Sequence, residues 1–167
     1  MFKKIALLLL LIAPMSLFAQ KFGHIKSMDI VTVMPEYTKA QNDIQAMQKQ
    51  YEEEIKRANE EFTKKYTEYQ QEQANLPKNI QDRRQKELQD LSEKGMQFQQ
   101  DAQQQLQKSY AEMMEPIYKK VEDAIKAVGV EGGYTFIFDV NRTDIPYISD
   151  TLTTDVTAAV KTKLGLK

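Results

Sequence analysis

The stretch that decides the fold is residues 44–69, which read IQAMQKQYEEEIKRANEEFTKKYTEY. Its apolar and aromatic residues recur in steps of three, four and four, at Ile44, Met47, Tyr51, Ile55, Ala58, Phe62, Tyr66 and Tyr69. This spacing repeats every eleven residues, about 3.67 residues per turn, which is close to the period of an undistorted α-helix. The pattern predicts a long, nearly straight helix with one apolar stripe.

A second helix of the same kind is predicted after a turn. Leu76-Pro77-Lys78-Asn79 interrupts the first stripe, and a proline fits the first turn of a new helix better than a helix interior. The second stripe is formed by Leu88, Leu91, Gly95, Phe98, Ala102, Leu106, Tyr110, Met113, Ile117, Val121, Ala124 and Val128, with Phe98 one place early. Two such helices form an antiparallel hairpin, in which Gly95 and the alanines are expected to let the backbones approach.

The length of the first helix indicates an arm that projects. From Glu36 to Leu76 the chain would span roughly 60 Å at 1.5 Å per residue. A helix pair of that length cannot fold back into a small globule. Pro116 lies inside the second stripe and predicts a bend or break near Glu115-Pro116, where the arm would end.

The sequence beyond the arm indicates strands and a short helix. Gly129, Gly132 and Gly133 predict the end of the long helix, and residues 134–140 alternate as a strand would, with Tyr134, Phe136, Phe138 and Val140 on one face. Residues 145–149, IPYIS, are interpreted as its hairpin partner strand. Residues 150–154 offer N-cap candidates for a last helix whose apolar side begins at Leu152, and a strand near residues 21–26 would complete the sheet.

The expected fold is therefore mainly α with a small β body. Residues 36–115 form the long helical-hairpin (coiled-coil) arm, and residues 20–35 and 116–167 form a body of a small β-sheet and a terminal helix. Hydrophobic residues make up 41% of the chain and mean hydropathy is −0.58, which favours an elongated shape with a narrow core.

Residues 1–19 have the layout of a secretory signal peptide. Lys3 and Lys4 precede an apolar run from Ile5 to Phe18, and polar sequence begins after Ala19. The run is short for a membrane span of roughly 20 residues and is interrupted by Pro14. We expect cleavage near Ala19 and export to the periplasm, with a permanent signal anchor as the alternative.

Charge and residue usage exclude several classes of function. The chain has 23 Lys and Arg against 24 Asp and Glu, which argues against nucleic-acid binding. It has no cysteine and a single histidine, His24, which we interpret as structural, so no metal site or cofactor is expected. Residues 139–144 lack the glycine and the distant glutamate of a calcium loop and are interpreted as a hairpin turn. No nucleophile–base pair or phosphate-binding glycine loop is present, so no enzyme activity is expected.

The order of these segments resembles the Skp (OmpH-like) family of periplasmic chaperones. The resemblance is carried by KFGHIKSMDIV at 21–31 after the signal peptide, by the polar helical hairpin, by Pro116-Ile117 followed by AIKAVG at 124–129, by GGYTFIFDVN at 132–141, and by LTTDV at 152–156. It covers essentially the whole chain after residue 20, and its order and spacing are more specific than any one motif.

The resemblance implies a homotrimer, with three hairpins standing off a shared β body around a cavity. Such proteins hold unfolded outer-membrane β-barrel precursors without ATP. The trimer-body candidates are Phe136, Phe138, Ile145 and Tyr147, and the client-contact candidates are Tyr66, Tyr69, Met96 and Phe98. The tyrosines and methionines supply adaptable contacts, although at helical spacing they also suit a coiled-coil core.

This chain departs from the basic character of the known family members. Removal of residues 1–19 takes away two lysines and leaves 21 basic against 24 acidic residues, a formal charge of −3. Its one modest basic cluster, by the predicted arm tip, is Lys78, Arg83, Arg84 and Lys86, diluted by Asp82 and Glu87. We therefore expect at most weak contact with membranes.

Two other classes of function remain compatible with the pattern. A structural coiled coil of the cell envelope could space or tether other proteins. A hydrolase using a surface carboxylate is the third hypothesis. A spacer would not suppress the aggregation of an unfolded protein, and activity screens would detect the hydrolase.

Overall fold

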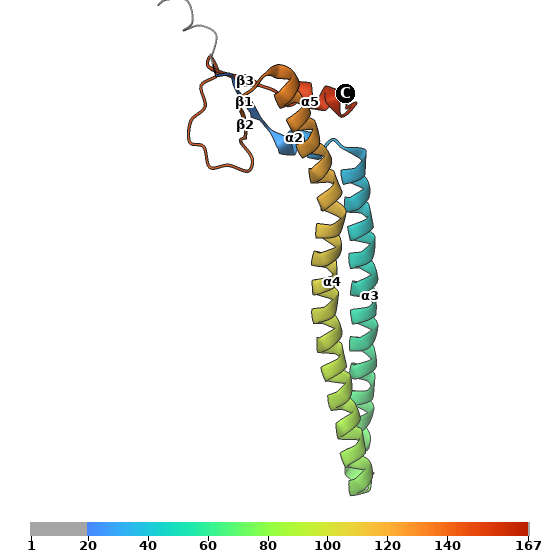
Figure 1. Ribbon diagram of the computed structural model, residues 1–167. Helices are drawn as coiled ribbons and strands as arrows, with labels where there is room; N and C mark the ends of the chain where they lie inside the picture. Colours follow the sequence, from blue (N-terminus) through green and yellow to red (C-terminus); the bar gives the residue numbers. More distant parts are fainter. Residues whose placement is uncertain (1–19, 167) are drawn as a thin grey trace, which may run out of the picture. The chain divides into compact units, whose positions relative to one another are not determined.

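The computed structural model describes residues 20–166 (Figure 1), so the predicted signal peptide lies outside the described residues. The elements in chain order are β1 Phe22–Ile25, α2 Ser27–Val31, α3 Pro35–Glu72, the 3₁₀ helix η1 Gln73–Asn75, α4 Lys78–Gly132, β2 Phe136–Asp139, β3 Thr153–Asp155 and α5 Thr157–Lys163. Residues 35–117 form one compact unit, and the described residues on either side form the other. The predicted class, mainly helical with a small sheet, is confirmed.

The predicted helical hairpin is present in the unit of residues 35–117. Figure 1 shows α3 and α4 side by side and antiparallel. The reversal falls where the sequence predicts it: Leu76 is extended, and the carbonyl of Pro77 accepts hydrogen bonds from the amides of Ile80 and Gln81 at 2.9 and 3.0 Å. The side-chain amide of Gln81 donates to the carbonyls of Gln73 and Leu76, both at 2.9 Å, and fixes the turn.

The seam between the two helices differs from the predicted stripes at three positions, one of which is Met114, buried on α4 where the half-buried Met113 was predicted. Tyr66 is 45% exposed, and the half-buried Lys65 takes its place between Phe62 and Tyr69. Lys65 fits because its long aliphatic stem packs in the seam while its ammonium reaches Glu87 on α4. On α4, Tyr110 is exposed and Ser109 is buried instead, because the step after Leu106 is three residues rather than four.

Pro116 does not break α4, contrary to one form of the prediction. The helix is continuous from Lys78 to Gly132 with Pro116 inside it. A proline removes a single backbone donor, and helical hydrogen bonds on both sides can carry the helix past that position. The helix ends at the predicted glycines: Gly133 has φ +63°, and the Tyr134 amide donates to the Gly129 carbonyl at 2.9 Å.

The sheet is parallel throughout, with strand order β2-β1-β3. The predicted strand near residues 21–26 is its central strand, with Phe22 opposite Phe136 and Thr153. The prediction of a strand at residues 145–149, and of a hairpin turn before it, is wrong. Pro146 has no N–H for a ladder there, and the β-branched pair Thr153-Thr154 lies against β1 instead.

The last helix begins later than predicted. Leu152 is 79% exposed and precedes β3, whereas α5 starts at Thr157. The carboxylate of Asp155 accepts a hydrogen bond from the Thr157 amide at 2.8 Å, so Asp155 rather than an earlier threonine satisfies the start of α5. Val156 and Val160 are buried, and α5 packs against α2, where Ile30 and Val31 are also buried.

The turn after β2 anchors the short helix α2. The Asp139 carboxylate accepts hydrogen bonds from the amides of Ser27 at 3.3 Å and Asn141 at 3.1 Å. The side-chain carbonyl of Asn141 accepts from the Met28 amide at 3.1 Å. Asp139 and Asn141, which are distant in sequence, thus cap the N-terminus of α2. The N-cap residue of this helix, Lys26, provides no capping hydrogen bond from its side chain.

Replacing Asp139 is expected to destabilise this unit. Asp139→Ala leaves two backbone amides without their acceptor, which should lower the free energy of unfolding by roughly 1–2 kcal/mol. Urea unfolding followed by circular dichroism measures the change. Asp139→Asn keeps an acceptor oxygen and should lose less; equal losses for the two variants would show that the capping hydrogen bonds are not the cause.

Candidate functional site

One face of the sheet carries exposed aromatic side chains. The strand register places Phe22, His24, Phe136 and Phe138 on the same face. The rings of Phe22 and Phe136 stack with centroids 6.2 Å apart, and Phe136 and Phe138 follow at 5.9 Å. Phe136 is 57% exposed and Phe138 is 37% exposed. Parallel sheets are normally covered on both faces by other elements. The aromatic face of this sheet is only partly covered, and in this sense it is incomplete.

Other apolar side chains of the same unit are also open to solvent. Among the predicted trimer-body residues, Tyr147 is 78% exposed and Ile145 is half-buried, both in the loop before β3. Sequence reasoning did not single out Val130, which is 84% exposed, and it placed Leu152, which is 79% exposed, on the apolar side of the last helix. The helical period places Val130 off the apolar stripe of α4. An apolar residue at such a position is expected to be exposed, and this was the signal in the sequence that could have identified it.

His24 forms a polar cluster beside the aromatic face. The Thr153 hydroxyl donates to the Ser149 carbonyl at 2.7 Å, so it must accept from Nδ1–H of His24, which lies 3.0 Å away. Nε2 of His24 faces the Asp155 carboxylate at 3.8 Å. Burial raises the pKa of Asp155, but hydrogen bonds from Thr157 outweigh it and hold that pKa below its usual value, with help from His24. These bonds connect β1 to β3, which supports the structural interpretation of His24.

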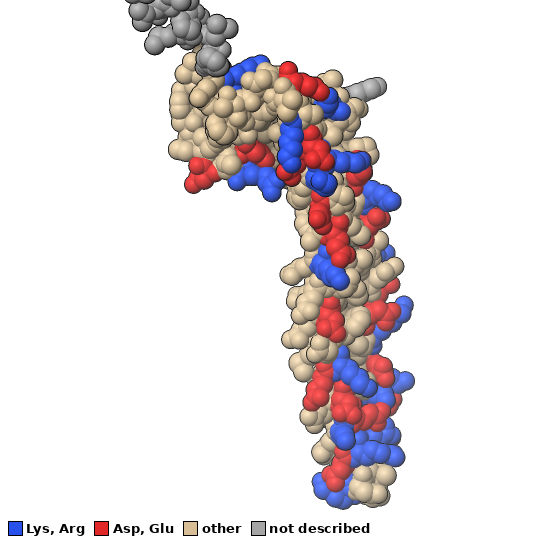
Figure 2. All heavy atoms as spheres, viewed as in Figure 1, with Lys and Arg blue, Asp and Glu red and all other residues tan. Residues whose placement is uncertain are grey.

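The four predicted client-contact residues fall into two pairs. Tyr66 and Met96 are exposed on the hairpin, at 45% and 58%. Tyr69 and Phe98 lie in the seam: Tyr69 is buried, and the Phe98 ring contacts Tyr51 edge to face at 5.9 Å between centroids. Figure 2 shows acidic and basic side chains interspersed along the hairpin, with uncharged surface between them.

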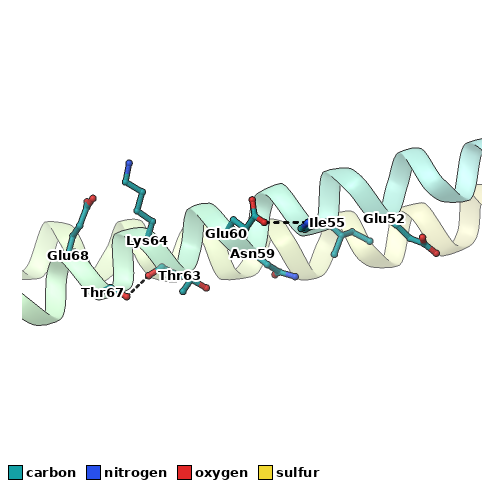
Figure 3. Close-up of a pocket in the computed structure, with 9 residues that line it drawn as sticks. Glu52, Ile55, Asn59, Glu60, Thr63, Lys64, Thr67 and Glu68 are labelled. Atoms are coloured by element: carbon teal, nitrogen blue, oxygen red, sulfur yellow. Dashed lines mark hydrogen bonds and ion pairs between the residues drawn. The ribbon is translucent and has the colours of Figure 1, made fainter.

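One hollow on the hairpin is an open groove along α3, with a volume of about 740 Å³. Figure 3 shows its lining side chains, all from this one helix. One row alternates in charge through Glu52, Lys56, Glu60, Lys64 and Glu68, and Lys56 and Glu60 are 3.8 Å apart. The groove offers extended contact to a chain but does not enclose a reacting group.

A charged pair joins the two helices near the hairpin turn. Lys65 on α3 donates a hydrogen bond to Glu87 on α4. This hydrogen bond lowers the pKa of Glu87, and it raises the pKa of Lys65. The neighbouring Arg84 contributes in the same direction at Glu87. The ion pair therefore links the two helices through polar groups, at a position where the sequence predicts a continuous apolar stripe.

The lowered pKa of Glu87 predicts an acid-dependent stability of the hairpin. The stabilisation is complete above the unfolded-state pKa, about 4.3 for a glutamate, and is lost as the pH falls through the lower folded-state value. Glu87→Gln should therefore unfold more easily than the wild type at neutral pH, and the difference should shrink in acid. Thermal melts across pH measure this; a difference that stays constant into strong acid would contradict it. Glu93→Gln, at an exposed position of α4, is the control.

Within residues 20–166, no group of three or more His, Asp or Glu side chains is placed to hold a metal ion. In that same described part of the chain, no helix is both long enough and apolar enough to span a membrane.

A family model and a solved structure are similar to this chain. A family model described as "Outer membrane protein (OmpH-like)" matches residues 21–164. Among solved structures, the chain is similar to an OmpH-like protein from Caulobacter crescentus CB15, described as an outer membrane chaperone. That match has a TM-score of 0.72 at 12% sequence identity, and covers 88% of this chain and 85% of the other. The comparison with curated proteins gave no match.

The family match covers most of the described chain. The matched range includes the strand after residue 20, the hairpin, β2, β3 and α5. These are the segments on which the sequence resemblance rests. The chain therefore belongs to the Skp (OmpH-like) family.

Proposed function

We propose that the protein is a periplasmic holding chaperone that binds unfolded outer-membrane β-barrel precursors without ATP. Membership of the OmpH-like family supports a chaperone role in general. The observation that carries the finer proposal is the helical hairpin itself. Most apolar side chains of its seam are only half-buried, and its outer surface carries polar, charged and exposed apolar side chains such as Tyr66 and Met96.

This surface suits many weak contacts. Exposed methionine and tyrosine side chains adapt to different partners, because methionine is flexible and tyrosine has both an apolar ring and a polar hydroxyl. The alternating charges along α3 favour neither an acidic nor a basic client. Contacts that are individually weak hold an unfolded chain and still release it, which a holding chaperone requires.

We infer that the working form is a homotrimer, assembled through the unit that contains the sheet. The incomplete aromatic face supports this, since Phe22, Phe136 and Phe138 would be removed from water by neighbouring copies. Residues 20–35 and 116–167 would then form the shared body, and residues 36–115 would form three arms around the client.

A structural spacer of the envelope is the alternative, and aggregation of a client separates the two. An outer-membrane barrel protein is diluted from urea into buffer without nucleotide, with or without the mature protein. The holdase should suppress light scattering when one trimer is present per client. Unchanged scattering would favour the spacer, because a spacer has no affinity for unfolded chains.

A further inference from the structure

A crevice crosses the seam of the hairpin halfway along its length. It has a volume of about 210 Å³ and lies wholly within the unit of residues 35–117. Its apolar lining comes from both helices, from Ile55, Ala58 and Phe62 on α3 and from Leu91, Gly95 and Met96 on α4. Most of these side chains are half-buried, and Met96 is 58% exposed at the rim.

Gly95 is the residue that leaves this space open. Glycine destabilises a helix interior relative to alanine, so its presence at position 95 calls for a physical reason. The usual reason, close approach of two backbones, does not apply, because a Cβ atom on Gly95 would meet no other atom within 4 Å. The expectation that Gly95 lets the helices approach is therefore wrong. The space above Gly95 is empty, and the small Ala58 on the facing helix does not fill it.

The size and chemistry of the crevice define what fits it. Binding sites for drug-sized molecules span about 300–1,000 Å³, so this one is too small for them. An apolar cavity of about 150 Å³ is known to hold a benzene ring, so the crevice has room for one aromatic or large aliphatic side chain. None of its lining residues carries a charge, and Asn59, Ser92 and Gln99 offer only neutral polar groups. A charged group placed there would lose water without gaining a partner.

We propose that this crevice is a binding site for single aromatic or large aliphatic side chains of an unfolded client chain. The inference rests on the proposed holding function and names the place where a client residue is seated. Met96 at the rim adapts to the side chain that enters, since its thioether and its rotatable bonds fit irregular shapes. The site selects apolar side chains whatever the sequence of the client around them, as a holding chaperone requires.

Filling the crevice tests the proposal. The probe is a fluorescent, unstructured peptide with widely spaced phenylalanines in a Ser/Gly/Asn background, and binding to the mature protein is followed by anisotropy. Gly95→Leu occupies the crevice and should weaken binding by roughly 3- to 10-fold, the loss expected for partial exposure of one aromatic ring. Gly95→Ala should show a smaller loss. Gln104→Leu adds the same side chain at an exposed site of α4 and should not weaken binding.

A second variant guards against misfolding of the first. Met96→Ser changes an exposed rim residue, leaves the seam packing in place, and should also weaken binding. Unchanged affinity in folded Gly95→Leu, or in Met96→Ser if Gly95→Leu loses helix, overturns the crevice site while the holding function stands. A change of oligomeric mass in Gly95→Leu with unchanged affinity would assign the crevice to a second copy of the chain. Absence of binding in the wild type would instead overturn the holding function itself.

Discussion

Deletion of residues 60–98, with a short glycine-rich turn joining the ends, is expected to abolish protection of clients. The deleted segment removes the distal part of α3 and the start of α4, including Tyr66, Met96 and the interhelical pair Lys65–Glu87. It lies within the unit of residues 35–117, so the core formed by Ile25, Ile30 and Val160 keeps all its residues. Light scattering of a diluted barrel protein should return to the level of the client alone.

The control for this deletion is the state of the other unit. Circular dichroism and oligomeric mass should show a folded assembly of three shortened chains. Loss of protection with the assembly intact would assign holding to the hairpin. A shortened protein that still prevents aggregation would show that the hairpin is not the holding device.

Substitution of the aromatic sheet face is expected to dissociate the oligomer. Phe136→Ser with Phe138→Ser removes two side chains whose burial is worth about 1.5–3 kcal/mol each, and a trimer would lose this at every subunit. Analytical ultracentrifugation should then show the mass of one chain instead of three. Tyr66→Ser, an exposed aromatic on the hairpin, is the matched control and should leave the mass unchanged.

The outcome for the double variant separates two explanations of the open face. Retention of the wild-type mass would mean that other residues hold the subunits together, or that the face has a different role. Dissociation with the helix content retained would show that Phe136 and Phe138 act between subunits. Phe136 is 57% exposed and Phe138 is 37% exposed in the single chain, so neither belongs to its buried core and their replacement should not unfold it.

The helical hairpin could be predicted from the sequence because its signal is periodic and long. The eleven-residue spacing runs through both helices, and Leu76-Pro77 marks the reversal by local chemistry alone. One error along the seam arose where a polar residue depends on a distant partner. Lys65 enters the seam because Glu87 lies opposite, and a stripe drawn through apolar residues cannot show a partner on another helix.

The sheet was harder to predict because its strands are short and pair with distant segments. Residues 145–149 alternate better than Thr153–Asp155, yet the pairing partner of β1 is the shorter, more polar segment. The position of β3 at the edge of the sheet is decided by its pairing with β1 and by hydrogen bonds such as that from the Thr153 hydroxyl to the Ser149 carbonyl. The crevice at Gly95 depends on what the opposite helix leaves empty, which the sequence of either helix alone does not show.

Hydrogen–deuterium exchange of a barrel protein bound to the mature chaperone tests the central claim most directly. The complex is isolated by gel filtration without nucleotide, and the client's amides are followed by mass spectrometry. A client that is held unfolded should co-elute with the chaperone. Its amides should exchange at about the rate of amides in unstructured peptides in buffer without urea. Elution of the client apart from the chaperone, or strong protection of its strands while bound, would contradict the account.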